Sequence, residues 1–387
     1  MMKRLLRLCL SVILIFAVSK PFAQTDTCRL KISLLTCSPG TELYSTFGHS
    51  AIRVTDLAAG TDIVYNYGTF DFYDPMFLMK FTRGQLLYYL DQQSFSGFMN
   101  DYRAENRSVS EQILNLNCEE KTELQKALFV NIRDENKFYQ YDFLFDNCTT
   151  RIRDLILKQK GMQYQTANVL PATGFTFRNH IHHYLDNNKQ FWSKLGIDIL
   201  LGKKMDRAMT NDEAMFLPDY LEKGFDSSSS RNQHLVLTKK VLFEKQELAS
   251  EGFAITPSFV FWALAILIGL ATFFLRPNSK LLTAIDFFIF FFNGLLGCFL
   301  VFMWFGTDHN TTQNNLNLLW AIPTHIIAAF FIRNKNSASK LYFQVTTVLC
   351  ALLLLSWAFL PQELNKALFP WVLLTGIRSF SIFRSRT

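Results

Sequence analysis

The chain has 387 residues, of which 49% are hydrophobic and 18% charged, and its formal net charge is +7. This length exceeds that of one small domain, and the apolar residues are too concentrated at one end for a protein that is soluble throughout. Much of the positive charge lies in loops between apolar segments, so it does not indicate a nucleic-acid-binding protein.

The first 23 residues have the pattern of a secretory signal peptide. Met1–Arg7 is basic, and the apolar run Leu8–Val18 is too short for a comfortable membrane span. We expect cleavage near Ala23, with an uncleaved anchor as the alternative because Pro21 disfavours the cut. The chain that follows would then begin outside the inner membrane.

Residues 24–225 predict an exported domain of the α+β class. Strands are expected over Arg29–Thr36, Phe47–Val54, Asp62–Phe70, Leu86–Asp91 and Glu111–Asn117, which are rich in apolar and β-branched residues. Turn residues separate the first three of them. Helices are expected next, over Glu119–Asn131 and Thr149–Gln159, from their apolar spacing.

Residues 226–257 are expected to form a linker. Its first part, Asp226–Ser230, is predicted to be flexible. A Lys-rich amphipathic stretch follows, Leu235–Leu248, which we expect to lie against the membrane or to lead into the first span.

Residues 258–387 predict an all-α transmembrane domain of four to five helices. The expected spans are Ser258–Leu275, Leu281–Phe305, Leu316–Ile332, Leu341–Leu360 and a fifth, Ala367–Phe383, which Arg378 interrupts. The connections on one side carry Arg276, Lys280, Arg333, Lys335, Lys340, Arg378, Arg384 and Arg386, whereas the loops on the other side carry Lys366 alone. This asymmetry predicts a multi-pass inner-membrane protein whose soluble domain is periplasmic.

Cys148 and His49 are the candidate catalytic pair. Cys148 opens an expected helix and His49 lies on an expected strand. A helix N-terminus and a nearby imidazole both lower the pKa of a thiol, so Cys148 would be the nucleophile and His49 its proton carrier. The alternative is structural, because free cysteines and strand histidines are often buried core residues.

The exported part contains Cys28, Cys37, Cys118 and Cys148, in a compartment that permits disulfides. If Cys148 stays reduced, at most one bridge forms among the other three, and we expect Cys28 with Cys118. Sequence alone leaves the pairing open.

The cluster of His180, His182 and His183 suggests a metal site. No carboxylate or cysteine completes a ligand set at suitable spacing, so we expect no metal. No cofactor is expected either.

The order strand-His, strand, helix-Cys resembles the circularly permuted papain-like thiol enzymes. In that group a polar residue on the strand after the histidine orients the imidazole, and Asn66 occupies this position here. The alternative for Asn66 is an ordinary turn or edge-strand asparagine.

The resemblance is closer to the Lnb family of lipoprotein N-acyltransferases and covers nearly the whole chain. It rests on Leu34–Gly40, Tyr44–Val54, Tyr65–Phe72, Tyr141–Leu155, Asp308-His309 and Asn317–His325. It implies transfer of an acyl chain from a membrane phospholipid, through a Cys148 thioester, to the N-terminal amine of a lipoprotein. Candidate substrate-binding residues are Asn147, Asp308, His309 and His325. Helix–helix hydrogen bonding is the alternative role for the residues in or near the spans.

Two other functions remain open from the sequence. The same dyad could serve a membrane-anchored papain-like peptidase or amidase, in which water accepts the acyl group. The chain could also be a non-catalytic membrane scaffold with an inert Cys148, whose thiol pKa would be raised rather than lowered.

Overall fold

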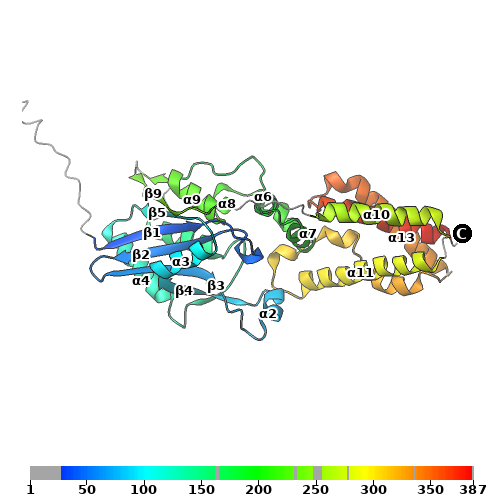
Figure 1. Ribbon diagram of the computed structural model, residues 1–387, viewed down its shortest axis with the longest axis horizontal. Helices are drawn as coiled ribbons and strands as arrows, with labels where there is room; N and C mark the ends of the chain where they lie inside the picture. The colour runs from blue at the N-terminus through cyan, green and yellow to red at the C-terminus, as the bar shows by residue number, and fades with distance from the viewer. Residues whose placement is uncertain are drawn as a thin grey trace, which may run out of the picture.

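The structure is a computed structural model that describes residues 28–161, 165–230, 233–246, 255–276, 279–334 and 336–385. The expected signal peptide lies outside the described residues. An antiparallel sheet with helices forms the N-terminal domain, and a bundle of apolar helices follows it (Figure 1). The expected fold class, an α+β domain followed by an all-α region, is confirmed.

The core of the first domain is a seven-stranded antiparallel sheet in the order β6-β4-β3-β2-β1-β5-β9. Its strands are β1 (Leu30–Cys37), β2 (His49–Asp56), β3 (Thr61–Thr69), β4 (Leu87–Ser94), β5 (Val109–Leu114), β6 (Phe138–Gln140) and β9 (Val236–Phe243). The five strands predicted from sequence are all present, with ends shifted by a few residues.

Helices cover both faces of this sheet. They are α2 (Phe77–Arg83), α3 (Phe95–Ala104), α4 (Cys118–Asn131), α5 (Cys148–Gln159), α6 (Phe177–Asn187), α7 (Phe191–Leu200), α8 (Asn211–Ala214) and α9 (Pro218–Ser227). Successive side chains of β1 point to opposite faces, so Leu34 joins the core with α4 and α5, whereas Leu35 packs with α3. The site helix α5 is thereby fixed on β2 and β3.

Within the expected linker over 226–257, the described residues 226–230 and 233–246 are largely folded, whereas residues 231–232 and 247–254 lie outside the described residues. Asp226 lies in α9, β7 (Ser229–Ser230) pairs with β8 (Gln233–His234), and β9 extends the sheet beyond β5. The described part of the Lys-rich stretch, residues 235–246, therefore contains an edge strand of the sheet in place of the expected amphipathic segment against the membrane, and it precedes α10 in the chain. Its lysines neutralise carboxylates: Lys239 Nζ lies 2.8 Å from Asp226 Oδ2, and Lys240 Nζ lies 3.1 Å from the buried Glu111 Oε2.

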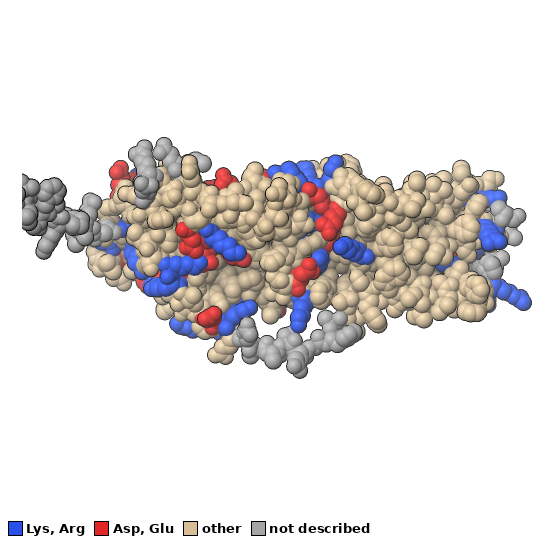
Figure 2. Space-filling model, turned by 90° about the horizontal axis from the view of Figure 1, so that it is seen from above, with Lys and Arg blue, Asp and Glu red and all other residues tan. Residues whose placement is uncertain are grey.

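The C-terminal region contains α10 (Pro257–Phe274), α11 (Lys280–Phe305), α12 (His325–Ala328), α13 (Ser337–Ser356) and α14 (Phe369–Arg384). Among the described residues, Pro257–Phe274, Lys280–Phe305 and Ser337–Phe359 are helices long and apolar enough to cross a membrane. Figure 2 shows Lys and Arg side chains at the end of this region remote from the sheet, and almost none along its middle.

The expected span Leu316–Ile332 does not form one continuous helix. It is divided into η4 (Leu316–Leu319), α12 and η5 (Ala329–Phe331), with Pro323 between η4 and α12. Its backbone packs directly on α11: a Cβ on Gly294 would lie 2.0 Å from Ile326 N, and one on Gly297 would lie 2.2 Å from Ala321 O. Irregular backbone is tolerated in an apolar region when protein covers it in this way.

Helix α14 corresponds to the fifth expected span, and its Arg378 is paired inside the bundle. Arg378 is buried and forms two hydrogen bonds with Asp286 of α11, of 2.6 and 2.9 Å. A third bond, from Nη1 to Thr272 Oγ1 of α10, measures 2.7 Å. One buried cation therefore joins three helices.

A polar joint connects the two parts of the molecule through α7. Asn317 Nδ2 donates to the backbone oxygen of Asp198 at 3.0 Å, and Asn315 Nδ2 donates to that of Ile199 at 2.7 Å. Gln362 Nε2 donates to Leu201 O at 3.0 Å. Because these amides satisfy the exposed C-terminal carbonyls of α7, the sheet domain is held at one end of the apolar bundle.

Candidate active site

Cys148 is the first residue of α5, and Asn147 is the N-cap that fixes it there. Asn147 Oδ1 accepts the backbone N–H groups of Thr149 at 2.8 Å and Thr150 at 2.9 Å, and the Thr150 hydroxyl accepts the N–H of Asn147. This capping box starts the helix at Cys148. The thiol consequently lies in the positive end of the helix dipole and is partly exposed.

His49 opens β2 and is held by the neighbouring strand. Its Nε2 lies 3.1 Å from Oδ1 of Asn66 on β3. Since an amide oxygen only accepts, Nε2 carries the proton in this bond, and Nδ1 is the nitrogen left for the thiol. The two strands thus orient the imidazole toward α5.

The electrostatics favour a reactive thiol. Burial opposes ionisation of Cys148, but its pKa still lies below the usual value, because the His49 imidazole attracts the thiolate and hydrogen-bonds to it. The backbone N–H of Ser50 and the hydroxyl of Thr149 add smaller contributions. Thr149 Oγ1 is itself 3.2 Å from Ser50 Oγ, so both groups are fixed.

Gly68 allows β3 to approach the nucleophile. Its φ of +87° lies in the left-handed region, and a Cβ there would be 3.3 Å from Cys148 Cβ and 3.8 Å from the Tyr141 ring. The pairing of β3 with β4 is irregular between Asn66 and Thr69, which places a bulge at this point. The bulge and the missing side chain together bring Asn66 and Cys148 to one site.

The other exported cysteines have different surroundings. Cys37 is buried on β1, and burial raises its pKa to about 12. Cys28 and Cys118 form a disulfide, which confirms the expected pairing. Cys148 is therefore the thiol among these four that is both accessible and stabilised as a thiolate.

The structure brings Cys148, His49 and Asn66 together and leaves the other expected site residues elsewhere. Asn147 is buried, and its Nδ2 donates to the carbonyls of Phe143 and Phe216, so the cap uses all its polar atoms. This contradicts the expected substrate contact by Asn147. The Asn147 side chain accepts the N–H groups of Thr149 and Thr150, and the N–H of Cys148, at the first position of α5, has no acceptor within the helix.

Asp308 and His309 lie on the loop after α11 and hold α2. Asp308 Oδ2 accepts from Gln85 Nε2 at 3.0 Å, and His309 Nε2 lies 3.0 Å from Phe81 O. His325 is buried inside the helical region, where Nδ1 lies 2.6 Å from the Tyr342 hydroxyl. The contacts of these three residues do not include Cys148 or His49.

The three clustered histidines point in different directions. His180 is buried among aromatic rings, and burial lowers its pKa to about 3. His182 bonds to the buried Asp198 at 2.7 Å, whereas His183 is exposed beside Asn187. No group of three or more metal-ligating side chains was found among the described residues.

Two family models match this chain. The Lnb N-terminal periplasmic domain matches residues 18–182, and the Lnb transmembrane domain matches residues 248–387. The chain belongs to the Lnb family. The match establishes a membrane protein with a periplasmic domain, and that domain contains His49, Asn66 and Cys148. Neither a curated protein nor a solved structure was found to match.

Sequence reasoning missed several contributors to the site. Ser50 and Thr149 act on the thiol through a backbone N–H and a hydroxyl, and neither residue type signals that role by itself. Gly68 did carry a signal, because a lone glycine within a strand often marks a bulge or a close approach of two chains.

Proposed function

We propose that this Lnb protein is a lipoprotein N-acyltransferase of the inner membrane, with its periplasmic domain as the catalytic part. The acyl donor is a membrane phospholipid and the acceptor is the N-terminal amine of a diacylglyceryl-cysteine lipoprotein. The observation that carries the proposal is the Cys148–His49–Asn66 arrangement at one helix N-terminus, in a domain joined to an apolar helical bundle. No cofactor takes part in this chemistry.

The first step forms a thioester. The Cys148 thiolate attacks the ester carbonyl of the phospholipid, the new C–S bond forms, and the C–O bond to the glycerol breaks. His49, protonated by the thiol, gives its proton to the departing oxygen of the lysophospholipid. The backbone N–H of Cys148, at the first position of α5, is suited to stabilise the negative oxygen of the tetrahedral intermediate.

The second step transfers the chain to nitrogen. The lipoprotein amine attacks the thioester, a C–N bond forms and the C–S bond breaks, so that Cys148 returns as thiolate. His49 removes the proton of the amine. Asn66 holds the imidazole in the tautomer that both steps require, as the third residue does in papain-like enzymes.

The membrane domain supports transfer over hydrolysis. Donor and acceptor are both anchored in the same leaflet, so holding the thiol at one end of the bundle raises its effective concentration toward both. A peptidase with a soluble substrate would gain no effective concentration from attachment to a membrane domain. An inert scaffold thiol would have a raised pKa, as Cys37 has, and Cys148 has the opposite shift.

Mass analysis of a lipoprotein N-terminus tests the proposal in cells. The N-terminal peptide should carry an additional amide-linked acyl mass in cells that express this protein, and should lack it in cells that express Cys148→Ala or nothing. An identical acyl mass in all three strains would refute the proposed reaction.

A further inference from the structure

Helix α2 exposes an apolar surface that a soluble domain would normally bury. None of its residues is buried: Leu78 is 74% exposed, Met79 55% and Phe81 50%. Contiguous apolar surface of this kind marks a site of contact with a lipid or a partner.

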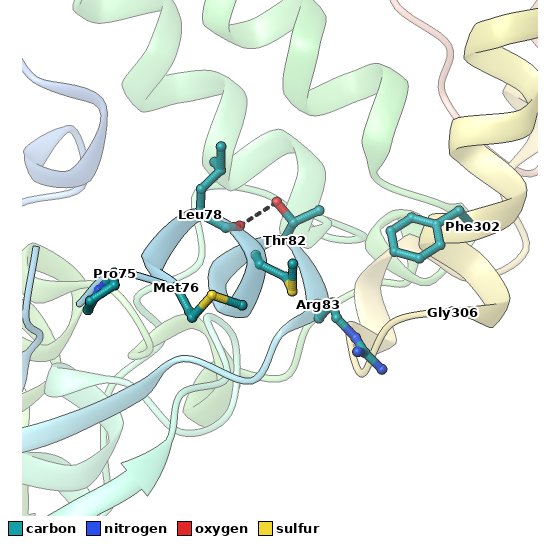
Figure 3. A pocket seen from close by; sticks show the side chains of 8 residues that line it. Pro75, Met76, Leu78, Thr82, Arg83, Phe302 and Gly306 are labelled. Carbon is teal, nitrogen blue, oxygen red and sulfur yellow. Dashed lines mark hydrogen bonds between the residues drawn. The ribbon is translucent and has the colours of Figure 1, made fainter.

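This surface forms one wall of a groove, and α11 forms the other. The groove has a volume of about 820 Å³ and is lined by Pro75, Met76, Leu78, Met79, Thr82, Arg83, Phe302 and Gly306. In Figure 3 the Phe302 side chain points from α11 toward α2. The volume is within the usual range for sites that hold a small-molecule ligand.

Hydrogen bonds hold the two walls of the groove together. The backbone N–H of Asp308 donates to Arg83 O at 2.9 Å, and Gln85 and His309 add the two bonds described above. These contacts attach the C-terminal end of α2 to the loop that follows α11. Asp308 and His309 thereby acquire a positioning role in place of direct contact with the reacting atoms.

The groove opens where α11 leaves the apolar part of the bundle. Trp304 and Phe305 stack there with ring centroids 4.9 Å apart, and Phe305 is 74% exposed. Aromatic residues of this kind are typical of the membrane–water interface. Arg83, at the rim, has no carboxylate partner among the described residues, and a phosphate is a suitable anion for it.

A row of aromatic rings runs from α2, which forms one wall of the groove, to the nucleophile. Along Phe81, Phe77, Phe70, Tyr88 and Tyr141, neighbouring ring centroids are 5.9, 5.8, 5.0 and 4.3 Å apart. Tyr141 then lies against Gly68, beside Cys148. An acyl chain that lies along these rings would exchange contact with water for contact with aromatic carbon.

We propose that this groove receives one acyl chain of the donor phospholipid from the bilayer, with Arg83 at the phosphate, and that the aromatic path leads the ester to Cys148. The inference rests on the proposed function for the role of Cys148. An acyl chain is the occupant because the site lies beside the C-terminal end of the apolar helix α11, is mostly apolar, and has Arg83 as the one charged residue of its described lining.

Leu78→Asp is the variant that tests this route, and Leu57→Asp is its matched control. Both leucines are 74% exposed, but Leu57 lies in the turn between β2 and β3, away from the groove. Acyl loading of Cys148 is measured with two donors: vesicles of long-chain phosphatidylethanolamine, and the water-soluble dihexanoyl phosphatidylcholine. We expect Leu78→Asp to lower the rate of acyl loading at least tenfold with vesicles and less than twofold with the soluble donor. Leu57→Asp should match the unchanged protein with both.

Equal loss with both donors, or no loss with vesicles, would overturn the proposed route. A second arm does not depend on catalysis: Cys148→Ala protein is irradiated in vesicles that contain a phospholipid with a diazirine on its acyl chain. Crosslinks on Met79 and Phe302 that Leu78→Asp abolishes would support the groove. Crosslinks confined to α10 and α13 would overturn it, even if the unchanged protein loads no acyl group and the proposed function itself fails.

Discussion

Cys148 and Cys37 differ in the groups that surround their thiols. Cys148 faces the His49 imidazole and the N–H of Ser50, whereas Cys37 is enclosed by the core under α3. The thiolate is the reactive form, so the pKa of each thiol sets its rate with an alkylating agent. The two residues therefore provide an internal comparison within one protein.

We expect iodoacetamide at pH 8 to modify Cys148 and to leave Cys37 untouched. In His49→Ala, the largest contribution that lowers the Cys148 pKa is lost while burial remains, so the midpoint of the alkylation profile should move to higher pH. Peptide mass spectrometry over pH 6 to 10 measures both effects. An unchanged midpoint in His49→Ala would show that the imidazole does not act on this thiol.

Asn66→Ala should reduce the acyl-transfer rate less than loss of either dyad residue. Removing His49 eliminates general acid–base catalysis, which contributes roughly 10²- to 10⁴-fold. Removing Asn66 only releases the imidazole from its 3.1 Å hydrogen bond. We therefore expect the acyl-transfer rate to fall by about 10- to 100-fold, as is found for groups that orient metal-bound histidines. A complete loss in folded Asn66→Ala protein would instead indicate direct contact with the substrate.

At the scale of the elements, the site depends on how closely β3 approaches α5. Gly68→Ala and Gly60→Ala form a matched pair, because φ is positive at both positions, +87° and +66°, and only Gly68 has neighbours within 4 Å of an added Cβ. Each should lower the free energy of unfolding by roughly 1–2 kcal/mol. Only Gly68→Ala should also slow alkylation of Cys148. Equal alkylation rates in the two variants would remove the proposed role of the bulge.

The elements that sequence predicts well are those with local signals. Cys148 and His49 can be proposed from sequence because a helix start and a strand are visible in short segments, whereas Asn66 was suggested by the resemblance to permuted papain-like enzymes. The position of β9 could not be predicted from sequence, because its lysines pair with carboxylates on β5 and α9 that are distant in the chain. The break near Pro323 likewise depends on two glycines of α11, Gly294 and Gly297, that only the fold brings beneath it.

At the scale of the whole molecule, buried polar pairs specify how the apolar helices assemble. Arg378→Met should destabilise the protein by about 3–5 kcal/mol, because it leaves the carboxylate of Asp286 buried without its partner. The double variant Asp286→Leu/Arg378→Met should recover most of that loss. Thermal unfolding in detergent measures both, with Arg276→Met as an exposed control. A double variant no more stable than Arg378→Met would contradict this account.

The central claim is that Cys148 carries the acyl chain between two membrane-bound substrates. The most direct test is intact mass analysis of the purified full-length protein after mixing with phospholipid alone. We expect one acyl mass on Cys148, release of lysophospholipid, and removal of the adduct by neutral hydroxylamine. A diacylated lipoprotein peptide with a free amine should then take up the chain, whereas its N-acetylated form should not. Cleavage of a cell-wall peptide without any acyl adduct on Cys148 would contradict the account.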